Sequence, residues 1–366
     1  MANESRAPHV GEGCERDGVV AVESFRLPLS PALSAEAAAA FIARQRRPMS
    51  ALASLEGPFA SDGEYRSVVD AFRVEMASLH KALARLARRT YAVDVEETVL
   101  GGVRVEIVRP SGGVLEANRH RVLINLHGGA FVGGAEACGL VESIPLSVVM
   151  GVEVVCVDYR QAYEHRFPAA SEDVAAVYRT LLESRDPEAI GIFGHSAGGM
   201  LVAQSLAWFA DAGLPRPGAV AMCSAGAGGV GDSHYLATVA MGDPVPGHDV
   251  RPGGWRAGYL GDADRLDPLV TPLHSPEVLA GFPPSLLLSG TRSFDLSDVV
   301  LTHRALDRAG VATELHVWEG LWHCFPYNPL MPESREAYEV LTRFFNRHLQ
   351  PVNAAIDPVA PVKSRG

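Results

Sequence analysis

The sequence predicts an α/β protein, in which a mostly parallel, twisted central sheet is flanked by helices and preceded by a helical segment. Short, continuous apolar runs recur along the chain, for example at 122–126 and 219–223, and such runs are typical of strands that are covered on both faces of a sheet. Apolar residues at helical spacing lie between and after these runs, around 174–182 and 337–345. Strands that alternate with amphipathic helices form doubly wound sheets.

The first 90 residues predict a helical cap segment. Residues 1 to about 20 are polar and rich in glycine, and we expect them to be disordered. The run at 35–42 is rich in alanine, and residues 65–89 carry apolar side chains at helical spacing. No strand signal precedes residue 93, so this segment is expected to lie outside the sheet.

Residues 91–350 predict one α/β domain, because every strand-like run falls within them. The expected strands lie at 93–96, 103–108, 122–126, 153–157, 189–193, 219–223, 285–288 and 313–318. Residues 225–284 are rich in glycine and proline and are expected to be an insertion that adds to the cap. Residues 351–366 are expected to form a loose C-terminal tail.

Composition and charge exclude several classes of protein. The formal net charge is −11, and the short basic run at 44–47 predicts a solvated helix end, which argues against nucleic acid and anionic membranes as partners. No run reaches the ~18 apolar residues of a membrane span, and no signal-peptide pattern is visible. The five cysteines are scattered, without metal-site or disulfide spacing, which predicts reduced thiols in a cytoplasmic protein.

The most informative motif is Gly-His-Ser-Ala-Gly-Gly at 194–199, which follows an apolar run. A serine flanked by glycines in this context indicates a nucleophile elbow, a strained turn that exposes the hydroxyl of Ser196. We expect Cβ atoms at Gly194 and Gly198 to collide with neighbouring backbone. His195 is expected to point away from the site and to be structural.

The motif His-Gly-Gly at 127–129 follows another apolar run. Acyl transfer builds negative charge on the former carbonyl oxygen, and preorganised N–H donors stabilise that charge. The N–H groups of Gly128, Gly129 and Ala197 are therefore the predicted oxyanion hole. The glycine pair at 133–134 predicts only a flexible turn.

His323 follows the last strand-like run, on a segment that can reach over the carboxyl edge of the sheet. There it would accept the proton of Ser196 as general base and return it as general acid. The order serine, acid, histidine along the chain fits this architecture. Cys324 is a rival nucleophile by proximity, but the framing glycines favour Ser196.

This set of motifs resembles the bacterial hormone-sensitive-lipase-like (family IV) carboxylesterases of the α/β-hydrolase fold. The resemblance extends over residues 90–348 and includes Asp-Tyr-Arg-Gln-Ala-Tyr-Glu at 158–164, Phe-Pro-Ala-Ala at 167–170 and Asp-Pro-Leu at 267–269. It implies a carboxylic-ester hydrolase with no metal and no organic cofactor, and with a cap over the acyl or alcohol pocket. Two departures, Ala130 for the common third glycine and His195 for a common aspartate, leave the nucleophile and the first two N–H donors in place.

The acid of the expected triad departs from the family pattern. The position that matches the family's aspartate is Ser293, and a neutral serine cannot stabilise an imidazolium. Asp295, two residues on in the same loop, is the first choice for the acid. Asp298 is expected to be a charge at a helix N-terminus, and Asp232, in the loop after 219–223, is a third choice.

These observations predict a serine hydrolase that cleaves small to medium apolar esters through an acyl-enzyme on Ser196. A lactone, an amide or a bulky xenobiotic ester stays open as the substrate, because cap residues build the pocket. A ligand-binding protein on the same scaffold is the rival from another class, and the presence of both Ser196 and His323 argues against it. The helix at 297–308, the run at 313–318 and the final helix could form a homodimer contact.

Overall fold

The structure is a computed structural model, and it describes residues 27–46, 55, 59–229, 231–233, 236 and 255–350. The expected disordered start, the middle of the expected insertion at 225–284 and the expected tail at 351–366 lie outside the described residues.

The described strands form one sheet in the order β1-β2-β4-β3-β5-β6-β7-β8. β1 pairs antiparallel with β2 and β2 with β4, while all other neighbours pair parallel. This confirms the predicted mostly parallel sheet, with strand ends shifted by a few residues from the expected ones. The strands are β1 Val93–Leu100, β2 Val103–Pro110, β3 Val122–Leu126, β4 Glu153–Val157, β5 Ile190–His195, β6 Ala219–Cys223, β7 Ser285–Gly290 and β8 Thr313–Trp318.

Helices cover both faces of the sheet. The α-helices are α1 Ala35–Gln45, α3 Asp62–Thr90, α4 Cys138–Met150, α5 Ala169–Leu182, α6 Ala197–Asp211, α8 Trp255–Leu260, α9 Pro276–Ala280, α10 Leu296–Arg308 and α11 Pro332–His348. Short 3₁₀ turns are η1 Glu116–Asn118, η2 Pro187–Ala189, η3 Pro272–His274 and η4 Phe325–Tyr327.

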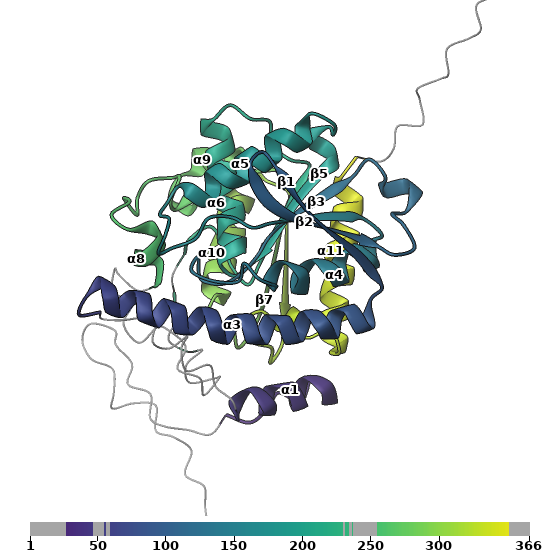
Figure 1. Cartoon of the computed structure of the whole chain (residues 1–366), viewed down its shortest axis with the longest axis vertical. Helices are drawn as coiled ribbons and strands as arrows, with labels where there is room; N and C mark the ends of the chain where they lie inside the picture. Colours follow the sequence, from purple (N-terminus) through teal and green to yellow (C-terminus); the bar gives the residue numbers. More distant parts are fainter. Residues whose placement is uncertain are drawn as a thin grey trace, which may run out of the picture.

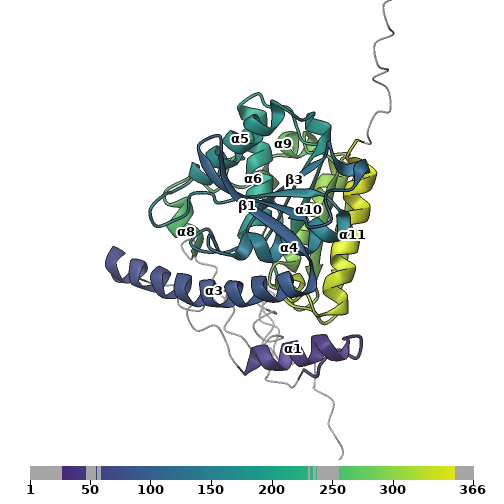
Figure 2. The same cartoon turned by 45° about the vertical axis from the view of Figure 1, so that its right-hand side comes forward.

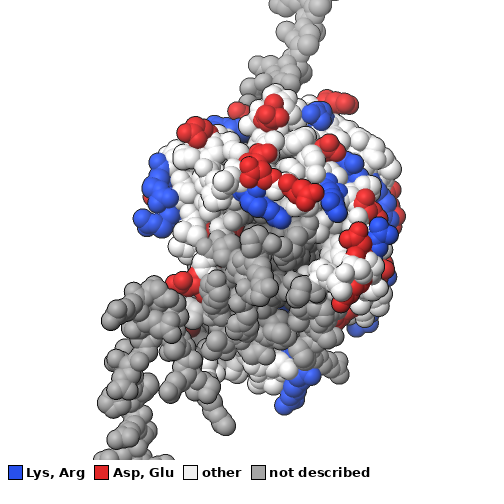
Figure 3. Space-filling model, turned by 90° about the vertical axis from the view of Figure 1, so that its left-hand side faces the viewer, with Lys and Arg blue, Asp and Glu red and all other residues white. Residues whose placement is uncertain are grey.

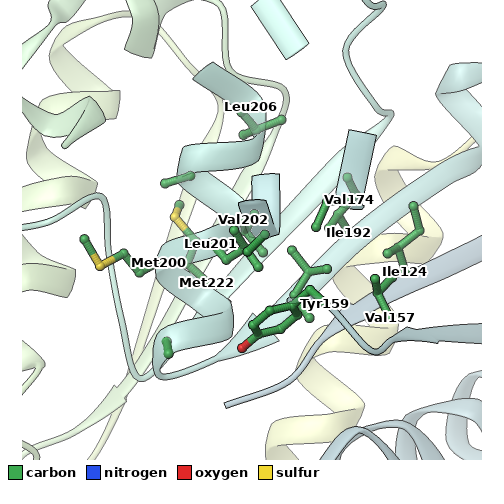
Figure 4. Close-up of a cluster of buried hydrophobic side chains, with 14 of the residues drawn as sticks. Ile124, Val157, Tyr159, Val174, Ile192, Met200, Leu201, Val202, Leu206 and Met222 are labelled. Carbon is green, nitrogen blue, oxygen red and sulfur yellow. The ribbon is translucent and has the colours of Figure 1, made fainter. Parts of the chain in front are cut away.

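Alternate residues of each strand serve two different cores. In β3, Val122 and Ile124 belong to the core cluster that includes residues of α5, α6 and α10, whereas Leu123 belongs to the cluster that includes residues of α4 and α11. Side chains of successive strand residues point to opposite faces, so an unbroken apolar strand is buried by helices on both sides. Figure 4 shows side chains of α6, such as Leu201 and Val202, directed toward those of the strands.

The two N-terminal helices lie across the end of the sheet at which the parallel strands finish. Figures 1 and 2 show α3 as a long helix along this end, with α1 beyond it. Ser34 caps α1 by accepting the N–H of Ala37, and it also hydrogen-bonds Glu333 at the start of α11. The ring of Phe41 in α1 lies 5.7 Å from that of Trp322. These contacts hold α1 beside the loop that carries His323.

The helix α4 was not among the helices that the sequence predicted. Almost all of its side chains are buried, including the proline at position 145. A helix that is buried all round lacks the alternation of apolar and polar faces from which a helix is recognised in a sequence.

On the face that Figure 3 shows, acidic and basic side chains of the described residues are interspersed, and no strongly basic patch forms there. Among the described residues, no helix combines the length and the apolar character that crossing a membrane requires.

Candidate active site

Ser196 lies on a sharp turn between β5 and α6. Its backbone has φ 55° and ψ −125°, a conformation that costs a non-glycine residue about 1–3 kcal/mol. A Cβ atom added at Gly194 or Gly198 would overlap the carbonyl oxygen of Leu126 on the adjacent strand. The predicted strain at this turn, and its requirement for glycine on both sides, are confirmed.

Ser196, His323 and Asp295 form one chain of hydrogen bonds. Oγ of Ser196 lies 2.9 Å from Nε2 of His323, and Nδ1 of His323 lies 2.7 Å from Oδ1 of Asp295. The three residues follow β5, β8 and β7, respectively. With Nδ1 protonated, the imidazole donates to Asp295, and its Nε2 can accept the hydroxyl proton of Ser196. The structure thus brings the three predicted side chains together.

The carboxylate of Asp295 is buried and receives further hydrogen bonds. Ser289 donates to Oδ2 at 2.6 Å, and Ser293 donates to Oδ1. Burial alone would raise the pKa of Asp295, but His323 and the two serine hydroxyls together lower it below its usual value. A carboxylate in this setting stays ionised beside the imidazole.

The two alternative acids lie elsewhere. Asp298 is in the first turn of α10, where its carboxylate accepts the N–H groups of Gly226 and Gly228 at 2.9 and 3.1 Å. Asp298 thus lies at the helix N-terminus, as expected, and its carboxylate anchors the loop after β6. Asp232 is exposed in the same loop. Of the three candidates, Asp295 is the one that the structure places against His323.

In the loop after β3, Gly128 is not available for the oxyanion hole in which it was expected. The N–H of Gly128 donates to Oε1 of Glu142 at 2.9 Å, so it points into the core and has no hydrogen left for a substrate. Gly129 and Ala130, with φ of 129° and 56°, line the substrate cavity instead. Within the described residues, the N–H groups of Gly129, Ala130 and Ala197 have no acceptor.

Glu142 is a fully buried carboxylate that the sequence analysis did not identify. Its Oε2 accepts a hydrogen bond from Asn125 at 2.7 Å and lies 3.5 Å from Nδ1 of His195, and its Oε1 accepts one from Tyr327. A signal was present in the sequence, because Asn125 is the polar residue of the apolar run at 122–126 and Glu142 is the charged residue of the apolar segment at 138–150.

His195 points away from the cavity and is completely buried, as expected for a structural residue. Burial alone would lower the pKa of His195, but Cys223 and Glu142 raise it to about 10. Burial alone would raise the pKa of Glu142. The contacts with His195, Tyr327 and Asn125 outweigh this effect, and the pKa of Glu142 is lowered below its usual value. The two side chains therefore lie next to each other beneath the nucleophile turn, and each favours the charged form of the other.

Cys324, the rival nucleophile, is unsuited to that role. Burial raises the pKa of its thiol well above the usual value, so that the thiol stays protonated. A protonated thiol is a weak nucleophile, because the thiolate is the reactive form. Its backbone adopts a left-handed conformation with φ 54°, and its N–H donates to Oγ of Ser224 at 3.1 Å. The residue therefore shapes the loop that carries His323.

Ser196 and His323 line a cavity of about 700 Å³, a size that accommodates a drug-sized molecule. The ring of Phe294 packs against the His323 ring at a centroid distance of 4.2 Å, tilted by 31°, and forms part of the wall. Further apolar wall residues come from α1, α3 and the loop after β8: Ala40, Ala43, Phe72, Met76, Leu79, Leu83, Trp322 and Phe325. The described residues contain no cluster of three or more side chains that could hold a metal ion.

Comparison with known proteins agrees with this fold. Residues 123–327 match the model of a family described as having the α/β-hydrolase fold. An acetyl-hydrolase of Streptomyces hygroscopicus is 32% identical over 67% of this chain and 80% of its own length. An esterase of Acinetobacter venetianus is 27% identical over 72% of this chain and 85% of its own length.

Solved structures give the same result. The structure of an esterase E25 has a TM-score of 0.79 and 29% identity, and the match covers 91% of this chain and 99% of that one. An esterase of the bacterial hormone-sensitive lipase family has a TM-score of 0.70 and 27% identity over 87% and 99% of the two chains.

The fold and the relatives define a carboxylic ester hydrolase. Within that class, the chain belongs to the α/β-hydrolase family and to its branch of bacterial hormone-sensitive-lipase-like carboxylesterases.

Proposed function

We propose that the protein hydrolyses small to medium apolar carboxylic esters through an acyl-enzyme on Ser196. The observation that carries the proposal is the hydrogen-bonded chain from Ser196 through His323 to Asp295, with distances of 2.9 and 2.7 Å. Its hydroxyl end opens into a largely apolar cavity, which favours an apolar group next to the ester.

In the proposed reaction, Oγ of Ser196 attacks the ester carbonyl carbon while Nε2 of His323 takes the hydroxyl proton. Asp295 keeps the imidazole oriented and stabilises the imidazolium that forms. His323 then protonates the departing alkoxide as the C–O bond breaks. A water molecule, deprotonated by His323, attacks the acyl-enzyme, and Ser196 regains its proton as the carboxylic acid leaves.

The oxyanion of each tetrahedral intermediate would accept hydrogen bonds from the N–H groups of Gly129, Ala130 and Ala197. The absence of acceptors for these groups among the described residues supports this assignment. Gly129 and Ala130 also line the same cavity as Ser196, and Ala197 follows Ser196 in the chain. Each such donor is worth about 2.7–4 kcal/mol in the transition state. Gly128 belongs to the loop but not to the set of donors.

We assign the role of the cap to the segment that includes α1 and α3, because both helices contribute walls to the cavity. A homodimer and a cytoplasmic location stay predictions. For the former, β8 is an edge strand of the described sheet, and analytical ultracentrifugation measures the oligomeric state directly.

The test is covalent labelling combined with a substrate panel. An alkyl fluorophosphonate should label Ser196 and no other residue, and Ser196→Ala should lose about a million-fold in kcat. p-Nitrophenyl esters of increasing acyl length, a lactone and an anilide then rank the substrate classes. A folded protein that hydrolyses none of them and takes no label would contradict the proposal.

A further inference from the structure

The carboxylate of Glu142 connects three segments of the proposed active site, although it touches none of the reacting atoms. Gly128 belongs to the loop that carries the oxyanion donors, His195 directly precedes the nucleophile, and Tyr327 follows His323 in η4. All three contact the carboxylate, Gly128 at 2.9 Å and His195 at 3.5 Å.

Such a carboxylate has a high desolvation cost unless donors surround it. Glu142 has no exposed surface. Asn125 donates to it at 2.7 Å, and the thiol of Cys138 lies 3.4 Å away. A buried acid that is satisfied so fully, in a helix that is otherwise almost entirely apolar, calls for a role beyond filling space.

The hydrogen bond from Gly128 fixes the direction of the oxyanion loop. The N–H of Gly128 turns inward to Glu142, and Gly129 and Ala130, which follow with positive φ, line the cavity. Glycine fits at this position because a Cβ atom there would lie only 2.6 Å from the hydroxyl of Tyr327 and 3.4 Å from Cβ of Ser196.

The charge of Glu142 would by itself oppose the oxyanion, which also carries negative charge. His195 offsets this charge, because Nδ1 of its ring lies 3.5 Å from the carboxylate and Glu142 favours the protonated form of the ring. A protonated ring so close to the carboxylate reduces the net repulsion at the oxyanion site.

We infer that Glu142 is a positioning residue, whose carboxylate accepts the N–H of Gly128 and thereby directs the N–H groups of Gly129 and Ala130 at the oxyanion. This inference rests on the proposed function and extends it to a residue outside the cavity. It predicts that the position of the acceptor oxygen matters more for the reaction than the charge of the side chain.

Two conservative variants separate these properties. Glu142→Gln keeps an acceptor at the same reach without the charge, and Asn125 can turn its amide to meet it, because Oδ1 of Asn125 has no partner among the described residues. Glu142→Asp keeps the charge, but its carboxylate is about 1.5 Å shorter in reach and should not meet Gly128. Ser147→Ala is the matched control, since it removes a buried polar group of the same helix that bonds Val108 and Val152 instead.

The variants are compared by kcat and KM for p-nitrophenyl butyrate, per active site titrated with a chromogenic phosphonate. A boronic acid measures affinity for a tetrahedral, anionic adduct. Glu142→Asp should lose at least about tenfold in kcat with KM unchanged, and its boronate Ki should rise in parallel. Glu142→Gln and Ser147→Ala should stay within about threefold of the unaltered protein in both quantities.

The opposite ranking would overturn the inference: an active Glu142→Asp and an inactive Glu142→Gln would assign the effect to the ion pair with His195. A loss of kcat with unchanged boronate affinity would also overturn it. If Glu142→Asp does not fold, Glu142→Gln alone decides, because an amide that keeps the acceptor must keep kcat. The proposed hydrolase activity fails by a different result, namely an unaltered protein that neither turns over esters nor takes the phosphonate.

Discussion

The hydroxyl of Ser293 lies 3.5 Å from Nδ1 of His323 and donates a hydrogen bond to the carboxylate that this nitrogen contacts. Ser293 occupies the position that matches the family's aspartate, and the carboxylate comes instead from Asp295, two residues later. The side chain at 294 lies between them in sequence and packs on the imidazole face. The proposed acid thus lies two residues beyond the position that the resemblance indicates, and its carboxylate contacts Nδ1 of His323.

Replacement of Asp295 by asparagine should lower kcat by about 10⁴-fold, because an amide neither fixes the required tautomer of His323 nor stabilises the imidazolium. Steady-state kinetics with p-nitrophenyl butyrate measure the loss, and circular dichroism checks folding. Asp232→Asn, at an exposed position, is the control and should retain its activity. Near-normal turnover in Asp295→Asn would remove Asp295 from the mechanism.

The acid should be transferable back to position 293. In the double variant Asp295→Asn with Ser293→Asp, the new carboxylate would start from a position whose hydroxyl is already 3.5 Å from Nδ1 of His323. We expect at least about a tenfold gain in kcat over Asp295→Asn alone. Asp295→Asn with Ser293→Asn controls for shape, and an equal gain there would show that charge at 293 is not the cause.

A larger side chain in α1 should lower the activity on esters with long acyl chains. Ala40 lines the cavity, so Ala40→Phe should lower kcat/KM for p-nitrophenyl octanoate by about tenfold and leave the acetate within about twofold. Ala39→Phe, on the exposed side of the same helix, is the matched control. Equal losses on both esters would mean that α1 does not contact the acyl group.

Stability at mildly acidic pH should depend on His80 in α3. The ring is buried, neither nitrogen has a hydrogen-bond partner among the described residues, and burial lowers its pKa from 6.5 to about 4. Between these values the unfolded chain binds a proton that the folded chain does not. The free energy of unfolding is therefore not reduced by this group above pH 6.5, and it decreases as the pH falls from 6.5 toward 4.

The shift corresponds to about 3 kcal/mol of pH-dependent free energy of unfolding, which His80→Leu should abolish. Urea unfolding at several pH values between 7 and 4 measures the slope in both proteins. The exposed His165, replaced by leucine, is the control and should leave the slope unchanged. Parallel pH curves for the unaltered protein and His80→Leu would refute this prediction.

Most of the sheet could be predicted because its strands are short apolar runs of the right length. The run at 122–126, for example, is buried along its whole length in the structure. The long helix α3 was predicted from its apolar spacing, since only one of its faces is buried. α4 was not predicted, because a helix enclosed on all sides has no polar face to give it a period.

The candidate site was predictable where a motif fixes both residue type and position, as at Ser196 and His323. Gly128 was assigned wrongly because the direction of an N–H group depends on where its acceptor lies. Here the acceptor is Glu142, which comes close to Gly128 only when α4 packs in the folded protein. The local glycine pair could not reveal that contact. Asp295 was proposed because His323 requires a carboxylate partner, and not because Asp295 occupies the position of the family's aspartate, which here is Ser293.

The contribution of α1 and α3 to the cavity walls has an evolutionary consequence. Many of the described wall residues of the cavity lie before β1, whereas Ser196, Asp295 and His323 all lie after it. Recombination between related genes at the junction of α3 and β1 would therefore exchange that part of the wall as a single block and keep the proposed catalytic residues. New preferences could then arise without revisiting the strained turn on which turnover depends.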